Sequence, residues 1–256
     1  MSYTIDEKNQ ERQHLLAKIL NPLTTPILLR AGKIPGGRCL DIGCGQGHTT
    51  RLLAEVLEPA ECIGLDYDPK LVAYAAEQAG NGAGIRFVQG NAMQLDFPDA
   101  SFDVVFTRYL LIHMADPMAV IREMMRVVKP GGKVIAFEPD CSLDISYPDG
   151  WAMERMTYLW KGLFATALMG RKLLYSFRGL SPTHIEAGVL MGMESEGTDY
   201  RRIYRISAEA VEEAVIANGL MSREEHQELV AELVRLEHDP ACVVFKLPDM
   251  WVIATR

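Results

Sequence analysis

The stretch LDIGCGQGHTT, residues 40–50, joins a short apolar strand to a helix through a glycine-rich turn. Three glycines alternate with other residues in this turn: Gly43, Gly45 and Gly47. Glycine lets the backbone turn tightly and come close to a ligand. A second apolar strand, CIGLD at 62–66, ends on Asp66, and a carboxylate at such a strand end accepts hydrogen bonds from a ribose in open α/β sheets. The two segments together predict a site for a nucleoside-bearing cofactor.

The spacing of the glycines separates this site from those that bind dinucleotides or nucleoside triphosphates. It is G-x-G-x-G, whereas dinucleotide-binding folds carry G-x-G-x-x-G with a pyrophosphate on the helix amino terminus. Asp41 precedes the glycines, where it would repel a pyrophosphate but suit a ligand with an ammonium or sulfonium group. The chain also lacks the G-x-x-x-x-G-K-[ST] loop that cradles triphosphates. The sequence therefore favours a cationic nucleoside derivative.

Two further segments follow in a familiar order. GNAMQLDFPDASFDVVFTRYLLIHM (90–114) and EMMRVVKPGGKVIAFEPD (123–140) resemble the adenine-contact region with the fourth strand, and the fifth helix–strand segment, of class I S-adenosylmethionine-dependent methyltransferases. The small-molecule type, similar to the ubiquinone/menaquinone C-methyltransferase group, is the nearest in pattern. The resemblance spans residues from about 36 to 140 and is specific because four motifs occur together. It implies methyl transfer from S-adenosyl-L-methionine, leaving S-adenosyl-L-homocysteine, to an N, O or C nucleophile of a small organic acceptor without a metal.

The resemblance also implies where the cofactor is held. The family often has Asp before Ala at the adenine site, whereas this chain has Asn91-Ala92, and asparagine can still accept and donate hydrogen bonds. Arg108 follows the fourth strand, where the methionine part lies, although it could instead pair with a helix carboxylate. Thr49 could bind the ligand or only its own backbone. The predicted cofactor-binding residues are Asp41, Gly43, Cys44, Gly45, Gly47, Thr49, Asp66, Tyr67, Asn91, Ala92 and Arg108.

Candidates for catalysis and for holding the acceptor lie after the fourth strand and after residue 140. If the acceptor is a phenol or a ring nitrogen, His113 or Asp140 could remove its proton. His113 could equally be an ordinary core histidine. Residues 141–168 are rich in Trp, Tyr and Met, a stripe that either packs in the core or shapes a substrate cavity. The predicted acceptor-binding residues are Tyr3, His14, Tyr109, Tyr147, Trp151 and Tyr158.

Strand and helix patterns alternate along the chain, which predicts an α/β fold. Strands are expected at 38–42, 61–66, 85–89, 102–107, 132–138, 182–191 and 242–255, and helices at 5–20, 23–31, 48–57, 69–79, 117–128, 149–168, 170–178, 207–217 and 222–237. This is a Rossmann-like, seven-stranded, mostly parallel sheet with helices on both faces, and the resemblance implies an antiparallel last strand. We expect one methyltransferase domain over 1–256, made of an N-terminal helical cap (1–35), a cofactor-binding half (36–140), a helical substrate lid inserted after strand five (141–180) and C-terminal strands and helices (181–256).

Composition narrows the partners. The 256 residues carry a formal net charge of −8, and nucleic-acid binders usually display a basic face. The densest basic group, Arg201, Arg202 and Arg205, is expected on a solvated strand or loop rather than on a phosphate track. Five cysteines without a C-x-x-C, six scattered histidines and no signal-like or membrane-length apolar run predict a cytoplasmic protein with reduced thiols and no metal. We expect a monomer or homodimer that binds neither nucleic acid nor a membrane.

Three alternatives stay open at this point. The chain could methylate protein or RNA, which would need a wide groove and, for RNA, a basic surface. It could be a regulator that binds S-adenosylmethionine without turnover. It could also use the sulfonium only to catalyse a rearrangement by electrostatics, which the sequence does not separate from methyl transfer.

Overall fold

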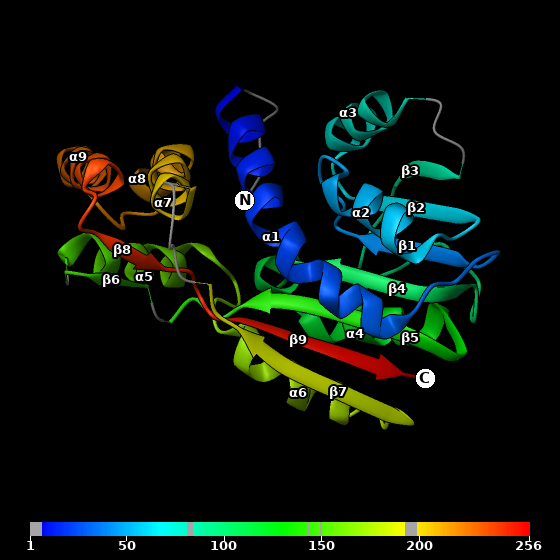
Figure 1. Cartoon of the computed structure of the whole chain (residues 1–256). Helices are drawn as coiled ribbons and strands as arrows, with labels where there is room; N and C mark the ends of the chain where they lie inside the picture. The colour runs from blue at the N-terminus through cyan, green and yellow to red at the C-terminus, as the bar shows by residue number, and fades with distance from the viewer. Residues whose placement is uncertain (1–6, 81–83, 143, 149, 193–198) are drawn as a thin grey trace.

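The computed structural model describes residues 7–80, 84–142, 144–148, 150–192 and 199–256. A seven-stranded sheet in the order β3-β2-β1-β4-β5-β9-β7 runs through its centre (Figure 1). Every neighbouring pair is parallel except those made by β9, which runs antiparallel to both β5 and β7. This confirms the predicted fold class with its antiparallel last strand. The strands are β1 (Arg38–Ile42), β2 (Glu61–Asp66), β3 (Ile85–Gln89), β4 (Phe102–Arg108), β5 (Val128–Pro139), β7 (His184–Leu190) and β9 (Asp249–Thr255).

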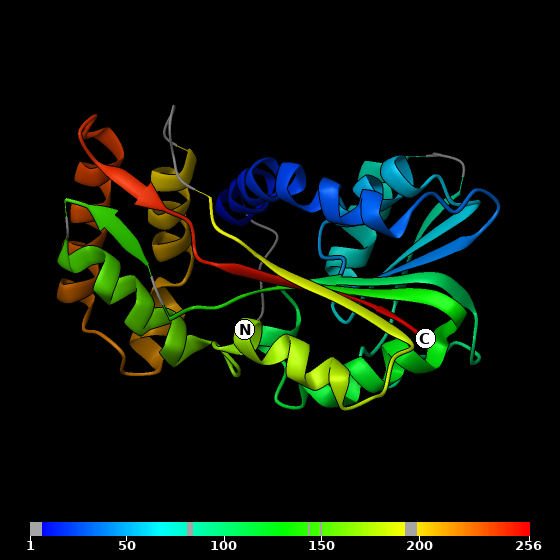
Figure 2. The same cartoon turned by 60° about the horizontal axis from the view of Figure 1, so that its bottom comes forward.

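Helices cover both faces of this sheet, because successive strand residues point to opposite sides. Val104 and Phe106 of β4 pack with α1 and α2, whereas Val105 between them packs with α4 and α6. Figure 2 shows these two helical layers above and below the sheet. The helices of the two layers are α1 (Glu7–Ala31), α2 (His48–Leu57), α3 (Pro69–Ala79), α4 (Pro117–Val127) and α6 (Met169–Arg178).

The N-terminal segment is one helix where two were predicted. Pro22 and Pro26 both lie inside α1, although each lacks the N–H that an interior helix position donates. Thr24 donates its hydroxyl to the carbonyl of Leu20 at 2.8 Å, and Thr25 does the same to Asn21 at 2.9 Å, so side chains satisfy carbonyls along this part of the helix. The expected break after Pro22 is therefore wrong.

Segments from the second half of the chain form a second lobe beside the sheet, on the left in Figure 1. Its small sheet pairs β6 (Ile145–Tyr147) with β8 (Val243–Phe245) in antiparallel fashion. The predicted strand at 242–255 is thus two strands, β8 in the lobe and β9 in the main sheet, with Pro248 between them. The helices of the lobe are α5 (Trp151–Leu163), α7 (Asp199–Ala210), α8 (Glu212–Ala217) and α9 (Arg223–His238).

Two expectations about this region differ from the structure. Within the expected lid at 141–180, β6 and α5 belong to the lobe, but α6 packs under the main sheet through the fully buried Leu173 and Phe177. The basic residues expected on a strand or loop lie instead on α7. One of them, Arg205, pairs with Glu209 and Glu237, because α7 packs along α9.

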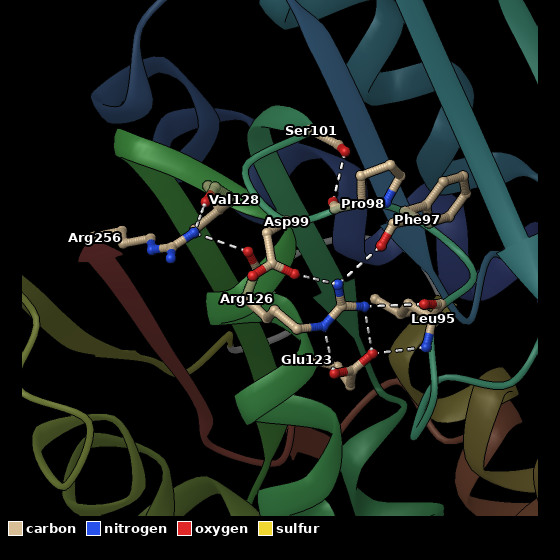
Figure 3. Close-up of polar contacts among 9 residues, drawn as sticks. All are labelled: Leu95, Phe97, Pro98, Asp99, Ser101, Glu123, Arg126, Val128 and Arg256. Carbon is tan, nitrogen blue, oxygen red and sulfur yellow. Dashed lines mark hydrogen bonds and ion pairs between the residues drawn. The ribbon is translucent and has the colours of Figure 1, made fainter.

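The loop that leads from β3 to β4 is fastened to α4 by the side chains of Arg126 and Glu123. Figure 3 shows Arg126 at the centre of this contact, donating hydrogen bonds to the carbonyl of Leu95 at 2.9 Å and that of Phe97 at 2.8 Å. Glu123 pairs with Arg126 and accepts the backbone N–H of Leu95 at 2.7 Å. These bonds hold the stretch that follows Asn91 in a fixed position at the edge of the sheet.

No helix among the described residues is both long and apolar enough to cross a membrane. Within the same residues, no three His, Cys, Asp or Glu side chains gather as a metal ion would require.

Candidate active site

A cavity of about 970 Å³ lies at the carboxyl ends of the parallel strands. Its position is the crevice beside β1, from which the strand order runs outward in both directions, and ligands of open α/β sheets bind at this place. One end is walled by the glycine turn and by the segments after β2 and β3. The other end reaches the second lobe, and its walls come from α1, α5, α7 and the segments after β4 and β8.

Asp66 lies where β2 ends, and its side chain joins the cavity to the glycine turn. It accepts the backbone N–H of Gly45 at 2.9 Å and that of Asp68 at 3.0 Å. Gly45 has a φ of 53°, and a Cβ built there would meet nothing within 4 Å, so its backbone faces open space in the cavity wall. This leaves a bare main chain beside a carboxylate with further acceptor capacity.

Gly47, the last glycine of the turn, is needed for a different reason. Its φ is 79°, and a Cβ there would lie 2.7 Å from the ring of Phe87. It is not among the described residues that line the cavity, whereas Gly43 and Cys44 are. The glycine at this position therefore allows α2 to begin close to β3 rather than a ligand to approach.

Asp41 is buried behind the cavity wall, at 1% exposure, and accepts the hydroxyl of Thr50 at 2.7 Å. Burial raises the pKa of this carboxyl to about 7, opposed by the hydrogen bond from Thr50 and the charge of Arg108 and reinforced by Asp66. It does not line the cavity among the described residues, so any effect on a cationic ligand there acts through space.

The segment after β3 supplies the outer end of the cavity. Asn91, Ala92 and Met93 line it, together with Tyr67 after β2 and Thr49 at the start of α2. The Oδ1 of Asn91 accepts the backbone N–H of Met93 at 3.0 Å, which fixes this side chain at the cavity rim. Tyr67 is 76% exposed, so its ring is free to cover a flat ligand.

Arg108, at the end of β4, is anchored by α1 rather than by a helix carboxylate. Its Nη1 donates to Asn21 Oδ1 at 3.1 Å and to Thr24 Oγ1 at 3.0 Å, and the residue lines the cavity between its two ends. Burial lowers the pKa of the guanidinium. The charge of Asp41 has the largest opposing effect and raises this pKa. The pair of Arg108 and Asp41 thus places opposite charges on two neighbouring strands.

Tyr109 follows Arg108 and adopts a left-handed backbone with a φ of 58°. Its hydroxyl donates to Asp249 Oδ1 at 2.6 Å and accepts from Lys246 Nζ at 2.8 Å. Lys246 also forms an ion pair with Asp249. Tyr109 and Lys246 line the cavity, whereas Asp249 is fully buried behind them.

His113 lines the inner end of the cavity, where its ring contacts Phe164 edge-on with centroids 5.0 Å apart. Burial lowers its pKa to about 4, and the positive charge of Arg12 adds to this effect. The imidazole is therefore neutral near pH 7, but it is a weaker proton acceptor than a base with a pKa close to the working pH.

The other candidate base, Asp140, is not placed in the cavity wall among the described residues. Arg171 grips it with two hydrogen bonds of 2.6 and 2.8 Å, and Ser142 donates a third. Burial alone would raise its pKa, but the bonds from Arg171 and Ser142 outweigh burial, and the pKa is lowered. The structure thus gives Asp140 the role of an anchor for α6.

Most of the predicted acceptor-binding residues lie away from the cavity. Trp151 and Tyr158 are exposed on α5 and line a separate surface depression, and Tyr147 is 70% exposed. His14 is an exposed residue of α1, and its ring lies edge-on to that of His48 with centroids 6.0 Å apart. Tyr3 falls outside the described residues. Among the described members of the predicted set, Tyr109 alone lines the cavity.

The comparisons with known proteins bear on this site. Residues 40–136 match the family model described as a methyltransferase domain. Over this stretch the chain carries a methyltransferase domain. The matched stretch runs from β1 to β5 and so contains the glycine turn, Asp66, Asn91 and Tyr109.

Curated relatives are similar to this chain in sequence, and solved structures are similar to it in fold. Demethylmenaquinone methyltransferase of Bacillus licheniformis is 32% identical over 160 residues, which cover 62% of this chain and 66% of that protein. The chain therefore aligns with just under two thirds of this curated relative. The YcgJ protein of Bacillus subtilis has a similar fold, with a TM-score of 0.64 at 20% identity over 92% of this chain and 99% of that one. Phosphoethanolamine N-methyltransferase 2 of Haemonchus contortus, solved with S-adenosyl-L-methionine, also has a similar fold. Its TM-score is 0.58 at 21% identity, over 91% of this chain and 52% of that one.

The inner end of the cavity contains residues that are not among the predicted acceptor-binding residues. Arg12 of α1 donates to Ser207 of α7 at 3.0 Å, and Tyr204 stands one turn before Ser207. Trp160 belongs to the aromatic stripe of α5, but it points to the buried side of that helix, opposite Trp151. The sequence does mark Lys246, because this charged residue interrupts the apolar run CVVFKLP. No comparable pattern marks Tyr204 and Ser207 of α7.

Proposed function

We propose that this chain transfers a methyl group from S-adenosylmethionine to a nucleophilic atom of a small organic acceptor. The observation that carries the proposal is a single cavity that joins Asp66 and the glycine turn to a second, partly aromatic end. At about 970 Å³ it reaches the top of the usual range for ligand sites, roughly 300–1,000 Å³. That volume supports two ligands side by side rather than one.

The residues present fit the methyl donor at the outer end. Asp66 would bind the ribose hydroxyls, the open backbone of Gly45 would lie against the ligand, and Asn91 with Ala92 would contact the adenine. Asp41 and Arg108 would set the field around the amino acid part. When bound, S-adenosylmethionine supplies a methyl group that the positively charged sulfur has already activated.

The work of the protein is then to position the acceptor and to exclude water. Holding two reactants in line removes up to roughly 7–11 kcal/mol of the barrier in the best cases. Trp160 and Phe164 stack with centroids 5.5 Å apart, and the two rings give the inner end a flat apolar wall. Such a wall suits a small planar acceptor and keeps bulk water from the reacting atoms.

We also propose that the chain works in the cytoplasm, because all five cysteines are buried as free thiols. Among the described residues, α7 offers no support for a phosphate track, since Arg202 and Arg205 are paired with carboxylates and Arg201 donates to the backbone carbonyl of Asp239. A monomer or homodimer remains the expectation for the assembly.

The test is transfer of tritium-labelled methyl groups from S-adenosylmethionine to a panel of phenols, amines, thiols and carboxylic acids. Total RNA and total protein serve as competing acceptors. We expect label in at least one small molecule, loss of that product in Asp66→Ala, and full activity in Glu55→Ala, which removes an exposed carboxylate of α2. Label that enters only RNA or protein would contradict the proposal. Tight binding of S-adenosylhomocysteine without any turnover would favour the non-catalytic regulator.

A further inference from the structure

We propose that Tyr109, Lys246 and Asp249 together accept the proton of the methyl acceptor, with Tyr109 in contact with it. This inference rests on the proposed function, because it concerns the acceptor end of the same cavity. It assigns a role to two residues, Lys246 and Asp249, that come from a segment more than 130 positions away in the chain.

The geometry supplies a continuous path of hydrogen bonds from the cavity into the protein. The hydroxyl oxygen of Tyr109 accepts one hydrogen bond from Lys246 and donates its own proton to Asp249. A phenolic oxygen has a second lone pair, and Tyr109 lines the cavity, so this lone pair can accept a hydrogen bond from a ligand. Asp249 is at 0% exposure and is reached from the cavity through Tyr109 and Lys246.

The backbone of Tyr109 adopts an unfavourable conformation that its neighbours stabilise. A tyrosine in the left-handed region is less stable than one in an ordinary backbone conformation. Its neighbours fix it there: the Tyr109 N–H bonds the carbonyl of Phe137 at 3.0 Å, and Glu138 accepts the next two backbone N–H groups at 2.9 and 2.8 Å. This turn directs the side chain of Tyr109 toward Asp249, the first residue of β9.

The proposed step balances in atoms and charge. As the acceptor atom forms its bond to the methyl carbon, the carbon–sulfur bond breaks and its electron pair stays on sulfur. The acceptor releases its proton to the oxygen of Tyr109, and Tyr109 passes its own proton to the carboxylate of Asp249. The ammonium of Lys246 keeps its charge throughout and, through its hydrogen bond, orients the phenolic oxygen for the relay.

The two other candidate bases are less suited to this step. His113 has a pKa of about 4 because it is buried, so it holds a transferred proton weakly. Asp140 is engaged by Arg171 outside the cavity wall. Burial raises the pKa of Tyr109 well above its ordinary value, and the charge of Asp249 makes the second-largest contribution to this rise. The phenol therefore stays protonated and can relay a proton.

The test is the pH dependence of turnover in Tyr109→Phe and Asp249→Asn. The probe is the phenol or amine of the panel that the wild-type chain methylates fastest. We expect kcat to fall by about 10²-fold or more in both variants near neutral pH. The loss should shrink as the pH rises past the pKa of the acceptor, because an acceptor that is already ionised needs no base. Tyr175→Phe is the matched control, since its hydroxyl lies on α6 and the residue is 84% exposed.

Two further measurements keep the result interpretable. Calorimetry with S-adenosylhomocysteine should give an unchanged affinity in Tyr109→Phe, and the melting temperature should stay close to that of the wild type. A Tyr109→Phe variant with full kcat, or with the same fractional loss at every pH, would overturn the inference while leaving the proposed function intact. If the wild-type chain methylates no member of the panel, the proposed function itself fails.

Discussion

Asp41 is a carboxylate that the fold buries completely one residue before β1 ends. Its pKa of about 7, against an ordinary value of 3.8, follows first from the loss of water around it. Thr50 and Arg108 recover part of that cost by a hydrogen bond and by charge. A buried group with a raised pKa links the stability of the protein to pH.

The sign of this linkage is fixed by the direction of the shift. Protonated Asp41 favours the folded state, so its contribution is complete below about pH 3.8 and is lost as the pH rises through about 7. We expect Asp41→Asn to gain melting temperature relative to the wild type over that interval, in the absence of ligand. Differential scanning calorimetry of both proteins checks this, with Asp96→Asn as a control that removes an exposed carboxylate. A difference that is flat or falls with pH would contradict the assignment.

At the scale of elements, α1 is part of the site through one contact. Thr24 is fully buried and accepts a hydrogen bond from the guanidinium of Arg108, which stands at the end of β4. A hydrogen bond to a charged group contributes about 1.5–3 kcal/mol, and removing its acceptor leaves the donor buried. The helix is therefore bound to the sheet at the point where the two ends of the cavity meet.

Replacing the hydroxyl of Thr24 tests this contact. We expect Thr24→Val to lower the free energy of unfolding by about 1–3 kcal/mol and to weaken the binding of S-adenosylhomocysteine. Thr25→Val is a close control, because Thr25 makes the same bond to a helix carbonyl but has no contact with Arg108. Urea denaturation and calorimetry measure the two effects. Equal losses of stability and of affinity in both variants would show that the effect comes from the helix itself and not from its contact with Arg108.

The elements that the sequence could predict are those set by local patterns. The strands at 38–42, 61–66 and 85–89 coincide residue for residue with β1, β2 and β3, because local patterns of apolar residues, glycine and strand-end acid specify them. Asp66, Asn91 and Tyr109 reach the cavity because strand ends meet at one edge of a parallel sheet.

The acceptor end follows from contacts that no local pattern contains. Arg12 meets Ser207, and Tyr109 meets Lys246 and Asp249, across separations of more than 130 residues. The aromatic residues of α5 were recognised, but the side of the helix that faces the core depends on α8 and α9, which pack against it. Trp160 is buried for that reason, and Trp151 and Tyr158 are not.

At the scale of the whole molecule, two lobes share one cavity. The main sheet supplies the strand ends after β1, β2, β3 and β4, and α5, α7 and the segment after β8 line the other end. Figure 1 shows the lobe to which these elements belong beside the sheet. The crossover from β8 to β9 connects the lobes through Lys246 and Asp249, beside Tyr109. The arrangement places the expected donor and acceptor on either side of Arg108 and Tyr109.

The most direct test of this account is a crystal structure of the chain with S-adenosylhomocysteine. We expect ribose hydroxyls within hydrogen-bond distance of the Asp66 carboxylate, the adenine beside Asn91 and the thioether sulfur on the side of Tyr109. The inner end, between Trp160 and Lys246, should remain open for a second ligand. Density for the compound anywhere outside this cavity, or no density at a saturating concentration, would contradict it.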